Sequence, residues 1–289
     1  GLASKYLLQL RKLDQPFVLP ITTQNRRQLE KLLFSWSYKG VTDLVTKWVW
    51  PAPARLAVRF CVRHGLRPNQ VTLTGFFLAI AAGLLFYYGW YATGLAAGWL
   101  MTFLDTVDGK LARVTVTSSK FGHLFDHAID IIHPPLWYLA WGLGLARYGL
   151  PLSPGAWQLM LWLIFGGYIG GRLVEAIFTR FLGRFGIFCW QPRDSFFRLI
   201  TGRRNPNMIL LTLSLIAGRP DLGLWAVALW TSLSTLYLAY RLYRALQARK
   251  TSGPLTSWFE RVNGENGRRS LAVKIFTRRP IVMPDGSRV

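Results

Sequence analysis

Four aspartates lie close together in the stretch "LDTVDGKLARVTVTSSKFGHLFDHAIDIIH", which sits between two apolar runs. Asp105 and Asp108 are three residues apart and Asp126 and Asp130 are four apart, so on helices each pair shares one face. Two such helices facing each other would gather four carboxylates in one small cavity. That arrangement is very costly in a low-dielectric setting unless cations compensate the charge. Mg²⁺ or Mn²⁺ would compensate the carboxylate charge, because such hard cations take carboxylate oxygens as ligands. A cluster of this size could hold two ions.

A metal cluster of this kind suits the chemistry of a diphosphate. Bound metal can bridge the diphosphate and stabilise charge as a phosphorus–oxygen bond breaks. Gly109 and Ala112 remove bulk on the first of the two helices, where a ligand would approach the backbone closely. The alternative is structural: the carboxylates pair with the nearby cations Lys110, Arg113 and Lys120.

Long apolar blocks must position these carboxylates. The chain has 289 residues, of which 51% are hydrophobic, and its mean hydropathy is +0.24. Blocks of about 18 to 25 apolar residues are typical of membrane-spanning helices. We therefore predict an all-α, polytopic membrane protein with six transmembrane helices, at about residues 71–88, 92–111, 119–146, 156–178, 206–217 and 222–243.

The charge balance is strongly basic, with 35 Lys and Arg against 13 Asp and Glu and a net charge of +22. Nucleic-acid binding is one interpretation, but no recognition motif supports it. Attraction to anionic lipid headgroups fits six spans better. The loops alternate between basic and nearly bare, which predicts both termini in the cytoplasm and the aspartates at the cytoplasmic leaflet. Cys61 and Cys189 then fall on cytoplasmic segments, so we expect no disulfide.

Three regions follow from this pattern. Residues 1–65 form an amphipathic, juxtamembrane extension with no cleavable signal peptide, and its interfacial helices are broken at Pro51 and Pro53. They could instead form a cap on the cytoplasmic end of the bundle. Residues 66–247 form the transmembrane domain. Residues 248–289 form a basic cytoplasmic tail that could hold a short strand or helix.

The aspartates belong to a longer pattern of eight fixed residues. It runs Asp-x-x-Asp-Gly-x-x-Ala-Arg, eight further residues, then Gly-x-x-x-Asp-x-x-x-Asp, from Asp105 through Arg113 and Gly122 to Asp130. This resembles the motif of the CDP-alcohol phosphotransferases, also called CDP-alcohol phosphatidyltransferases. The resemblance covers roughly residues 66–180, and "RPNQVT" at residues 67–72 is similar to the start of the family's first span.

The resemblance implies an enzyme that cleaves a CDP-linked alcohol, passes the substituted phosphate to an acceptor alcohol and releases CMP. It implies metal ligation by Asp105, Asp108, Asp126 and Asp130, with Asp130 also the general base that takes the acceptor proton. It also implies a site for the nucleotide and diphosphate, in which Arg113 suits a phosphate. The residues of that site are Asn69, Thr72, Asp108, Gly109, Ala112, Arg113 and Gly122.

The acceptor site is less specific in the sequence. Lys120, His123, His127 and Arg172 are its candidates, although the histidines could equally be interfacial packing. Arg172 could pair with Glu175 one turn away, or face an anionic acceptor, as could "GRRN" at residues 202–205. The resemblance further implies a homodimer, phospholipid synthesis and, we expect, a bacterial inner membrane. CDP-diacylglycerol is the first choice of donor, and a CDP-linked headgroup passed to a lipid alcohol is the second. A cation transporter and a non-catalytic lipid-binding scaffold are remote alternatives.

Overall fold

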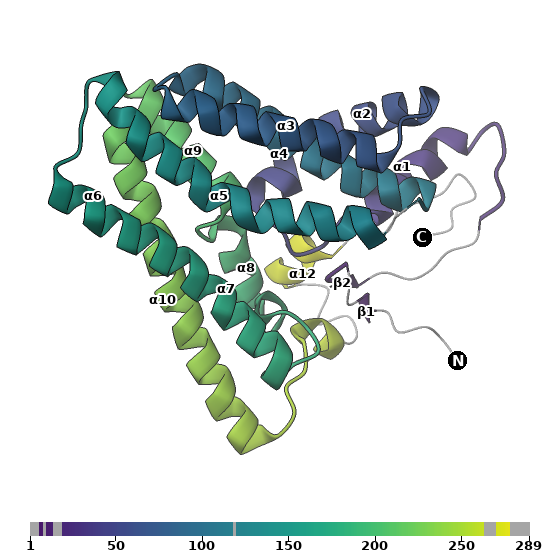
Figure 1. The fold of residues 1–289 in the computed structure, drawn as a ribbon. Coiled ribbons are helices and arrows are strands. Elements are labelled where there is room, and N and C mark those ends of the chain that lie inside the picture. The colour runs from purple at the N-terminus through teal and green to yellow at the C-terminus, as the bar shows by residue number, and fades with distance from the viewer. Residues whose placement is uncertain (1–5, 8–9, 14–18, 118–119, 263–269, 278–289) are drawn as a thin grey trace.

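The chain folds into a bundle of long helices with a layer of shorter segments at one end. A computed structural model describes residues 6–7, 10–13, 19–117, 120–262 and 270–277. The helices of the bundle are α3 (Pro68–Tyr87), α4 (Tyr91–Thr115), α5 (Lys120–Tyr148), α6 (Pro154–Leu161), α7 (Gly167–Ile177), α9 (Arg204–Ile216) and α10 (Pro220–Ser252). A π-helical turn joins α6 to α7, and a second one extends α7 to Leu182, so that these segments form one continuous helical unit. Figure 1 shows α3, α4, α5 and α9 running alongside one another, with α7 and α10 descending together from that group.

Six helices occupy the positions of the six predicted spans, so the helical class is confirmed. Three units in the described part of the chain are long and apolar enough to cross a membrane: Pro68–Tyr87, Pro154–Leu182 and Pro220–Ser252. The helix α9 has only 13 residues. The six-span count therefore remains a prediction.

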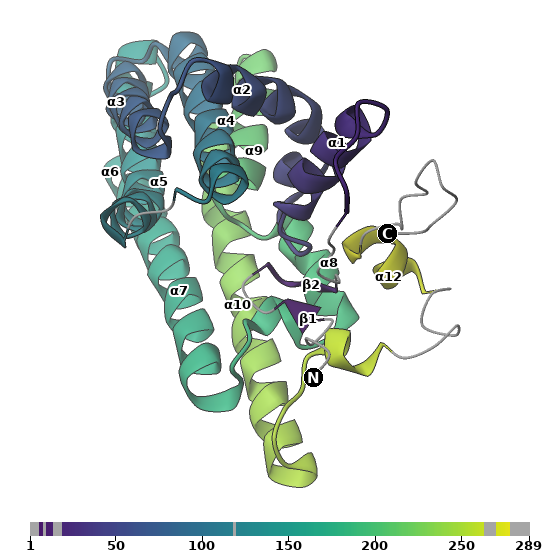
Figure 2. The ribbon, with the colours of Figure 1, turned by 90° about the vertical axis from the view of Figure 1, so that its right-hand side faces the viewer.

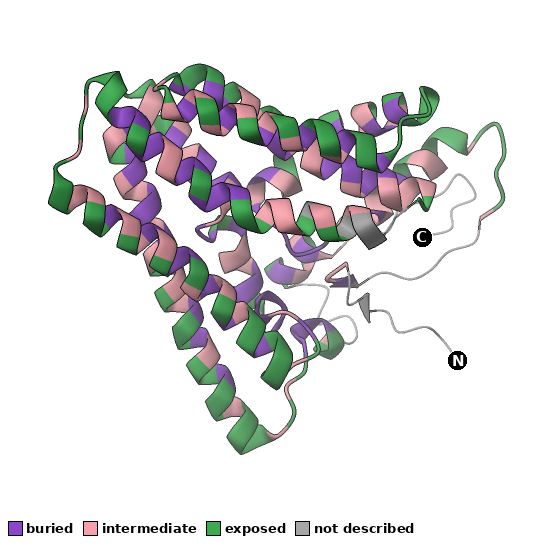
Figure 3. Cartoon of the chain, in the orientation of Figure 1, coloured by how far each residue is buried: buried purple, intermediate pink, exposed green. Residues whose placement is uncertain are grey.

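The outward faces of the long helices are apolar, as contact with lipid requires. On α3 the exposed side chains include Leu73, Phe77 and Leu84, and on α10 they include Leu229 and Leu236. Figure 3 shows this exposure running along the outer sides of the bundle. Surfaces of this extent would be costly in water. Together with the apolar helices, they identify the chain as an integral membrane protein.

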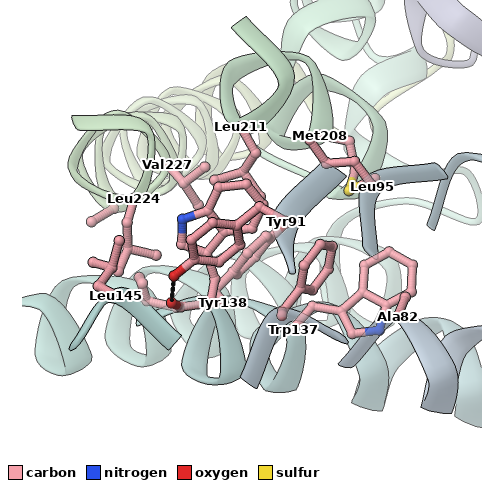
Figure 4. Close-up of a cluster of buried hydrophobic side chains, with 14 of the residues drawn as sticks. Ala82, Tyr91, Leu95, Trp137, Tyr138, Leu145, Met208, Leu211, Leu224 and Val227 are labelled. Atoms are coloured by element: carbon pink, nitrogen blue, oxygen red, sulfur yellow. Dashed lines mark hydrogen bonds between the residues drawn. The ribbon is translucent and has the colours of Figure 1, made fainter. Parts of the chain in front are cut away.

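The core inside the bundle is held by aromatic side chains that also satisfy backbone carbonyls (Figure 4). Tyr91 stacks on Trp141 with ring centroids 4.2 Å apart, and its hydroxyl donates to the Trp141 carbonyl at 2.7 Å. Trp137 donates to the carbonyl of Ala79 at 2.8 Å, and Trp141 to that of Pro220 at 3.0 Å. Each bond runs between helices, so the core fixes α3, α4, α5 and α10 relative to one another.

The described N-terminal and C-terminal segments lie on one side of the bundle (Figure 2). The segments there are β1 (Tyr6–Leu7) and β2 (Lys12–Leu13), which pair antiparallel, α1 (Arg26–Trp36), a π-helical turn (Val45–Val49), α2 (Pro51–Arg63), α8 (Pro192–Ile200) and α12 (Leu271–Phe276). A second buried cluster joins Phe276 of α12 with Val41, Phe188 and Trp258, which lie in the connections before or after these segments. The extension is thus packed as a cap. The tail contributes the short helix α12, and a helix is one of the two structures predicted for it.

The predicted break at Pro51 and Pro53 is wrong in detail. Pro51 is the first residue of α2 and Pro53 lies in its first turn, where a missing N–H has no helical partner to lose. The chain instead leaves the helical conformation earlier, between Trp36 and the turn that starts at Val45. Cys61 and Cys189 are both buried and free, so the prediction of no disulfide is confirmed.

Gly144 tests how closely α3 and α5 approach. A Cβ on Gly144 would overlap the Phe86 carbonyl oxygen and lie 3.1 Å from the Gly89 nitrogen, and neither backbone atom can move away cheaply. We expect Gly144→Ala to lower stability by about 1–3 kcal/mol, as overpacking does, seen as a lower thermal unfolding midpoint in detergent. Gly155→Ala is the matched control, because nothing lies within 4 Å of its new Cβ. Equal midpoints for both variants would contradict this account.

Candidate active site

The site lies where α4, α5 and α9 meet. Asp105 is on α4, Asp130 on α5, and Arg204 is the first residue of α9. The Arg204 guanidinium donates through Nη1 to Asp130 Oδ1 at 2.6 Å and through Nη2 to Asp105 Oδ2. One planar cation therefore bridges carboxylates from two helices, which brings Asp105 and Asp130 together as the spacing predicts.

Asp108 lies one turn beyond Asp105 and is only 4% exposed. Its Oδ2 accepts a hydrogen bond from the Thr72 hydroxyl at 2.6 Å, which ties α4 to the first turn of α3. Thr72 is a predicted nucleotide contact, and its hydroxyl lies beside a predicted metal ligand. Asp126 is on α5 one turn before Asp130, but its side chain lies outside the described residues.

The glycine of the motif has a visible steric role. A Cβ on Gly109 would lie 3.3 Å from Nη2 of Arg113, so the guanidinium folds back over the bare backbone of α4. Ala112 and Gly122 are both half-buried. Any larger side chain at position 109 would push the Arg113 guanidinium away from the backbone of α4.

The cation that bridges Asp105 and Asp130 is Arg204, which is not one of the three predicted partners. Lys110 is 3% exposed, and its Nζ lies 3.4 Å from the centre of the Tyr38 ring rather than on an aspartate. Lys120 has its side chain outside the described residues. Arg204 takes the pairing role from a helix far along the chain. The sequence offered "GRRN" as a basic group, but no spacing rule connects it to the motif.

Two prolines open the backbone of α5 beside Asp130. Pro134 and Pro135 have no N–H, so the carbonyls of Asp130 and Ile131 lack their usual helical donors. The hydroxyl of Tyr168 on α7 donates to the Ile131 carbonyl at 2.9 Å and lies 3.4 Å from that of Asp130. A side chain from another helix thus supplies the missing donor and fixes α5 at the turn that carries Asp130.

The predicted pairing of Arg172 with Glu175 is wrong. Arg172 donates to the Tyr168 hydroxyl at 3.2 Å, whereas Glu175 forms an ion pair with Arg203, just before α9. Arg203 lies outside α7 and pairs with the Glu175 carboxylate. Arg172 instead contacts the Tyr168 hydroxyl, which donates to the α5 backbone beside Asp130.

The other predicted residues are spread around this centre. Asn69 and His127 are exposed, and His123 has its side chain outside the described residues. His133, which the motif does not include, is 7% exposed and packs on Trp137 with ring centroids 4.6 Å apart. Its Nδ1 lies 2.6 Å from the Ile129 carbonyl, one turn earlier on α5.

The donor set fits a hard divalent cation. Asp105 and Asp130 supply carboxylate oxygens that already share one cation, the Arg204 guanidinium, and Asp108 follows on the same helix face. Within the described residues no group of three or more His, Cys, Asp or Glu side chains is gathered closely enough to hold a metal ion. The side chain of Asp126, the fourth carboxylate of the motif, lies outside the described residues.

The family of the domain follows from this geometry and from comparison. Residues 66–184 match the family model described as CDP-alcohol phosphatidyltransferase. The chain thus contains a CDP-alcohol phosphatidyltransferase domain, and the resemblance seen in the aspartate motif is confirmed. The family and its relatives are transferases of phosphate-containing groups in phospholipid synthesis, which confirms the predicted class of enzyme.

Similar proteins differ in the alcohols that they are named for. Over 69 residues the chain is 41% identical to an archaetidylinositol phosphate synthase of Pyrococcus horikoshii, covering 23% of this chain and 35% of that protein. Over 127 residues it is 39% identical to choline/ethanolaminephosphotransferase 2 of Arabidopsis thaliana, covering 40% and 31%. The chain thus spans about a third of the length of each. A structure of Mycobacterium tuberculosis phosphatidylinositol phosphate synthase with CDP-DAG bound has a TM-score of 0.45 and 18% identity, covering 65% of this chain and 92% of that one.

The Arg204 bridge should carry a measurable part of the stability. In Arg204→Met, two carboxylates that are 18% and 36% exposed lose their shared partner. We expect a loss of about 2 kcal/mol, less than for a fully buried pair, seen as a lower thermal unfolding midpoint. Arg219→Met removes an arginine from an exposed ion pair with Asp221 and should leave the midpoint unchanged. An unchanged midpoint in Arg204→Met would show that the bridge is not a structural bond.

Proposed function

We propose that this chain transfers a substituted phosphate from a CDP-linked alcohol, with CDP-diacylglycerol as the first choice, to an acceptor alcohol and releases CMP. The observation that carries the proposal is the convergence of Asp105 and Asp130 on one cation within the complete eight-residue motif. The reaction would run at the cytoplasmic leaflet, as the predicted orientation requires. We place it in phospholipid synthesis at a bacterial inner membrane, in a homodimer.

Asp130 is the residue best placed to act as general base. Its side chain is 36% exposed against 18% for Asp105, so a substrate hydroxyl can reach it. Arg204 holds only Oδ1, and within the described residues no hydrogen bond is made to Oδ2. In the proposed reaction the acceptor oxygen forms a bond to phosphorus, its proton passes to Asp130, and the bond from phosphorus to the CMP oxygen breaks.

The remaining residues bind and orient. Asp105, Asp108, Asp126 and Asp130 would hold one or two Mg²⁺ or Mn²⁺ ions, which would neutralise the diphosphate and make CMP a better leaving group. Arg113, which lies over Gly109, is in place to contact a phosphate. Arg172 faces the proposed acceptor side through Tyr168.

The second candidate is the transfer of a CDP-linked headgroup to a lipid alcohol. The similarity to a choline/ethanolaminephosphotransferase over 127 residues supports it. Purified protein supplied with Mg²⁺ or Mn²⁺ and CDP-diacylglycerol should release CMP with one acceptor from a panel of glycerol 3-phosphate, serine, inositol, inositol phosphate, choline and phosphatidylglycerol. CMP release only from CDP-choline or CDP-ethanolamine with diacylglycerol would favour the second candidate, and none from any pair would overturn both.

Asp130→Asn isolates the general base. The amide keeps the size of the side chain but cannot take a proton, so we expect CMP release to fall by about 10²-fold or more. Binding of the CDP substrate should be largely retained. Asp221→Asn is the matched control, because Asp221 sits at the start of α10 and pairs with Arg219 away from the site. Full turnover in Asp130→Asn would remove Asp130 from the mechanism.

Removal of metal tests the carboxylate site as a whole. We expect a chelator to abolish CMP release and added Mg²⁺ or Mn²⁺ to restore it, because uncompensated carboxylates would repel the diphosphate. The measurement is initial CMP release before and after metal is added back. Undiminished activity in chelator would contradict a metal-dependent site.

A further inference from the structure

The first three residues of the α9 region each hold a different part of the molecule. Arg203 pairs with Glu175 on α7, and Arg204 bridges Asp105 and Asp130 on α4 and α5. Asn205 donates through Nδ2 to Asp43 Oδ1 at 2.9 Å. Asp43 belongs to the N-terminal extension, which the motif does not include, so the extension touches the residue next to the carboxylate bridge.

The contact between Asp43 and Asn205 is buried and closely bonded. Asp43 is 6% exposed and Asn205 is 5% exposed. Asp43 also accepts from the Thr46 backbone N–H at 3.0 Å and from the Thr46 hydroxyl at 2.9 Å. Asn205 Nδ2 lies 3.2 Å from the same hydroxyl. The carboxylate of Asp43 thus caps the turn that begins at Val45 and also binds Asn205 at the start of α9.

Asp43 is also charged in this place. Burial by itself would raise its pKa, but Arg198 and the hydrogen bonds from Thr46 and Asn205 together hold the pKa below its ordinary value. The buried Arg198 guanidinium is attracted by Asp43 and by Glu175. Asp43 also attracts Arg204 electrostatically.

The rest of the extension anchors Asp43 from the opposite side. Gly40 donates to the Leu10 carbonyl at 2.8 Å and accepts from Lys47 Nζ at 3.0 Å. Trp50 packs its ring against Phe103 of α4, with centroids 5.3 Å apart. Asp43 is therefore a fixed point against which α9 is set, rather than the end of a loose loop.

We propose that Asp43 is a positioning residue of the active site: through Asn205 it sets the start of α9, and so places Arg204 between Asp105 and Asp130. This makes the N-terminal extension a working part of the transferase. The inference rests on the proposed function for its activity readout. A shift of about 1 Å in the Arg204 guanidinium would misorient Asp130, and displacements of that size cost up to about 10²-fold in rate.

A double-mutant cycle tests this inference, using Asp43→Asn, Arg204→Gln and the two combined. Asparagine can still cap the turn, so Asp43→Asn should fold. We expect it to lower kcat for CMP release by about tenfold with little change in KM for the donor. In the Arg204→Gln background the same change should alter kcat less than about twofold, because Asp43 acts through Arg204.

The control variant is Glu30→Gln, which breaks an exposed ion pair with Arg59 in the same extension and should leave kcat unchanged. An equal loss from Asp43→Asn in both backgrounds, or no loss in either, would overturn the inference. Wild-type protein that releases no CMP would instead overturn the proposed function. In that case, or if Arg204→Gln is too slow to measure, thermal midpoints of the same four proteins decide: additive shifts overturn the coupling and non-additive shifts support it.

Discussion

The bridge from Arg204 to Asp105 and Asp130 joins the consecutive helices α4 and α5 to α9, which lies far along the chain. Carboxylates gathered at the end of a helical bundle repel each other, and a low-dielectric surrounding magnifies that repulsion. A single guanidinium with two donors removes it, provided that α9 begins where the faces of α4 and α5 meet. The position of α9 is therefore an electrostatic requirement of the motif, and the contacts of Arg203 and Asn205 on either side meet it.

The backbone hydrogen bonding of α5, the helix that carries Asp130, is interrupted. Pro134 and Pro135 remove two backbone donors, and Tyr168 supplies a hydroxyl to the carbonyls left behind. Arg172 in turn donates to that hydroxyl. A change on the acceptor side of the site would thus be felt at the backbone of the proposed base. In the proposed reaction α7 would therefore act on Asp130 through the backbone of α5.

The cap formed by the N-terminal and C-terminal segments also contacts residues next to the site. Val41 and Phe276 share one buried cluster with Phe188 and Trp258, so the extension and the tail stabilise each other. From this cap Asp43 reaches Asn205, and Tyr38 covers Lys110 beside the motif. Outward-facing apolar residues on α3 and α10 meet lipid, whereas polar contacts concentrate where the cap meets the helix ends. The proposed chemistry is placed at that boundary, where a lipid substrate and a polar one can both arrive.

The sequence by itself determined the family, the helical class and the aspartates of the motif, because helix periodicity and fixed spacing are local properties. The spacing predicts that each pair of aspartates shares one face of its helix, and the packing of α4 against α5 brings Asp105 and Asp130 into one site. The sequence could not show that Arg204 is the counter-ion of these two aspartates, that Glu175 pairs with Arg203 instead of Arg172, or that Asp43 binds Asn205. Those partners lie far apart along the chain, and only the packing of α9 against α4, α5, α7 and the cap decides which charges meet. Buried charges must find partners, but the sequence does not say which of many arginines will be within reach.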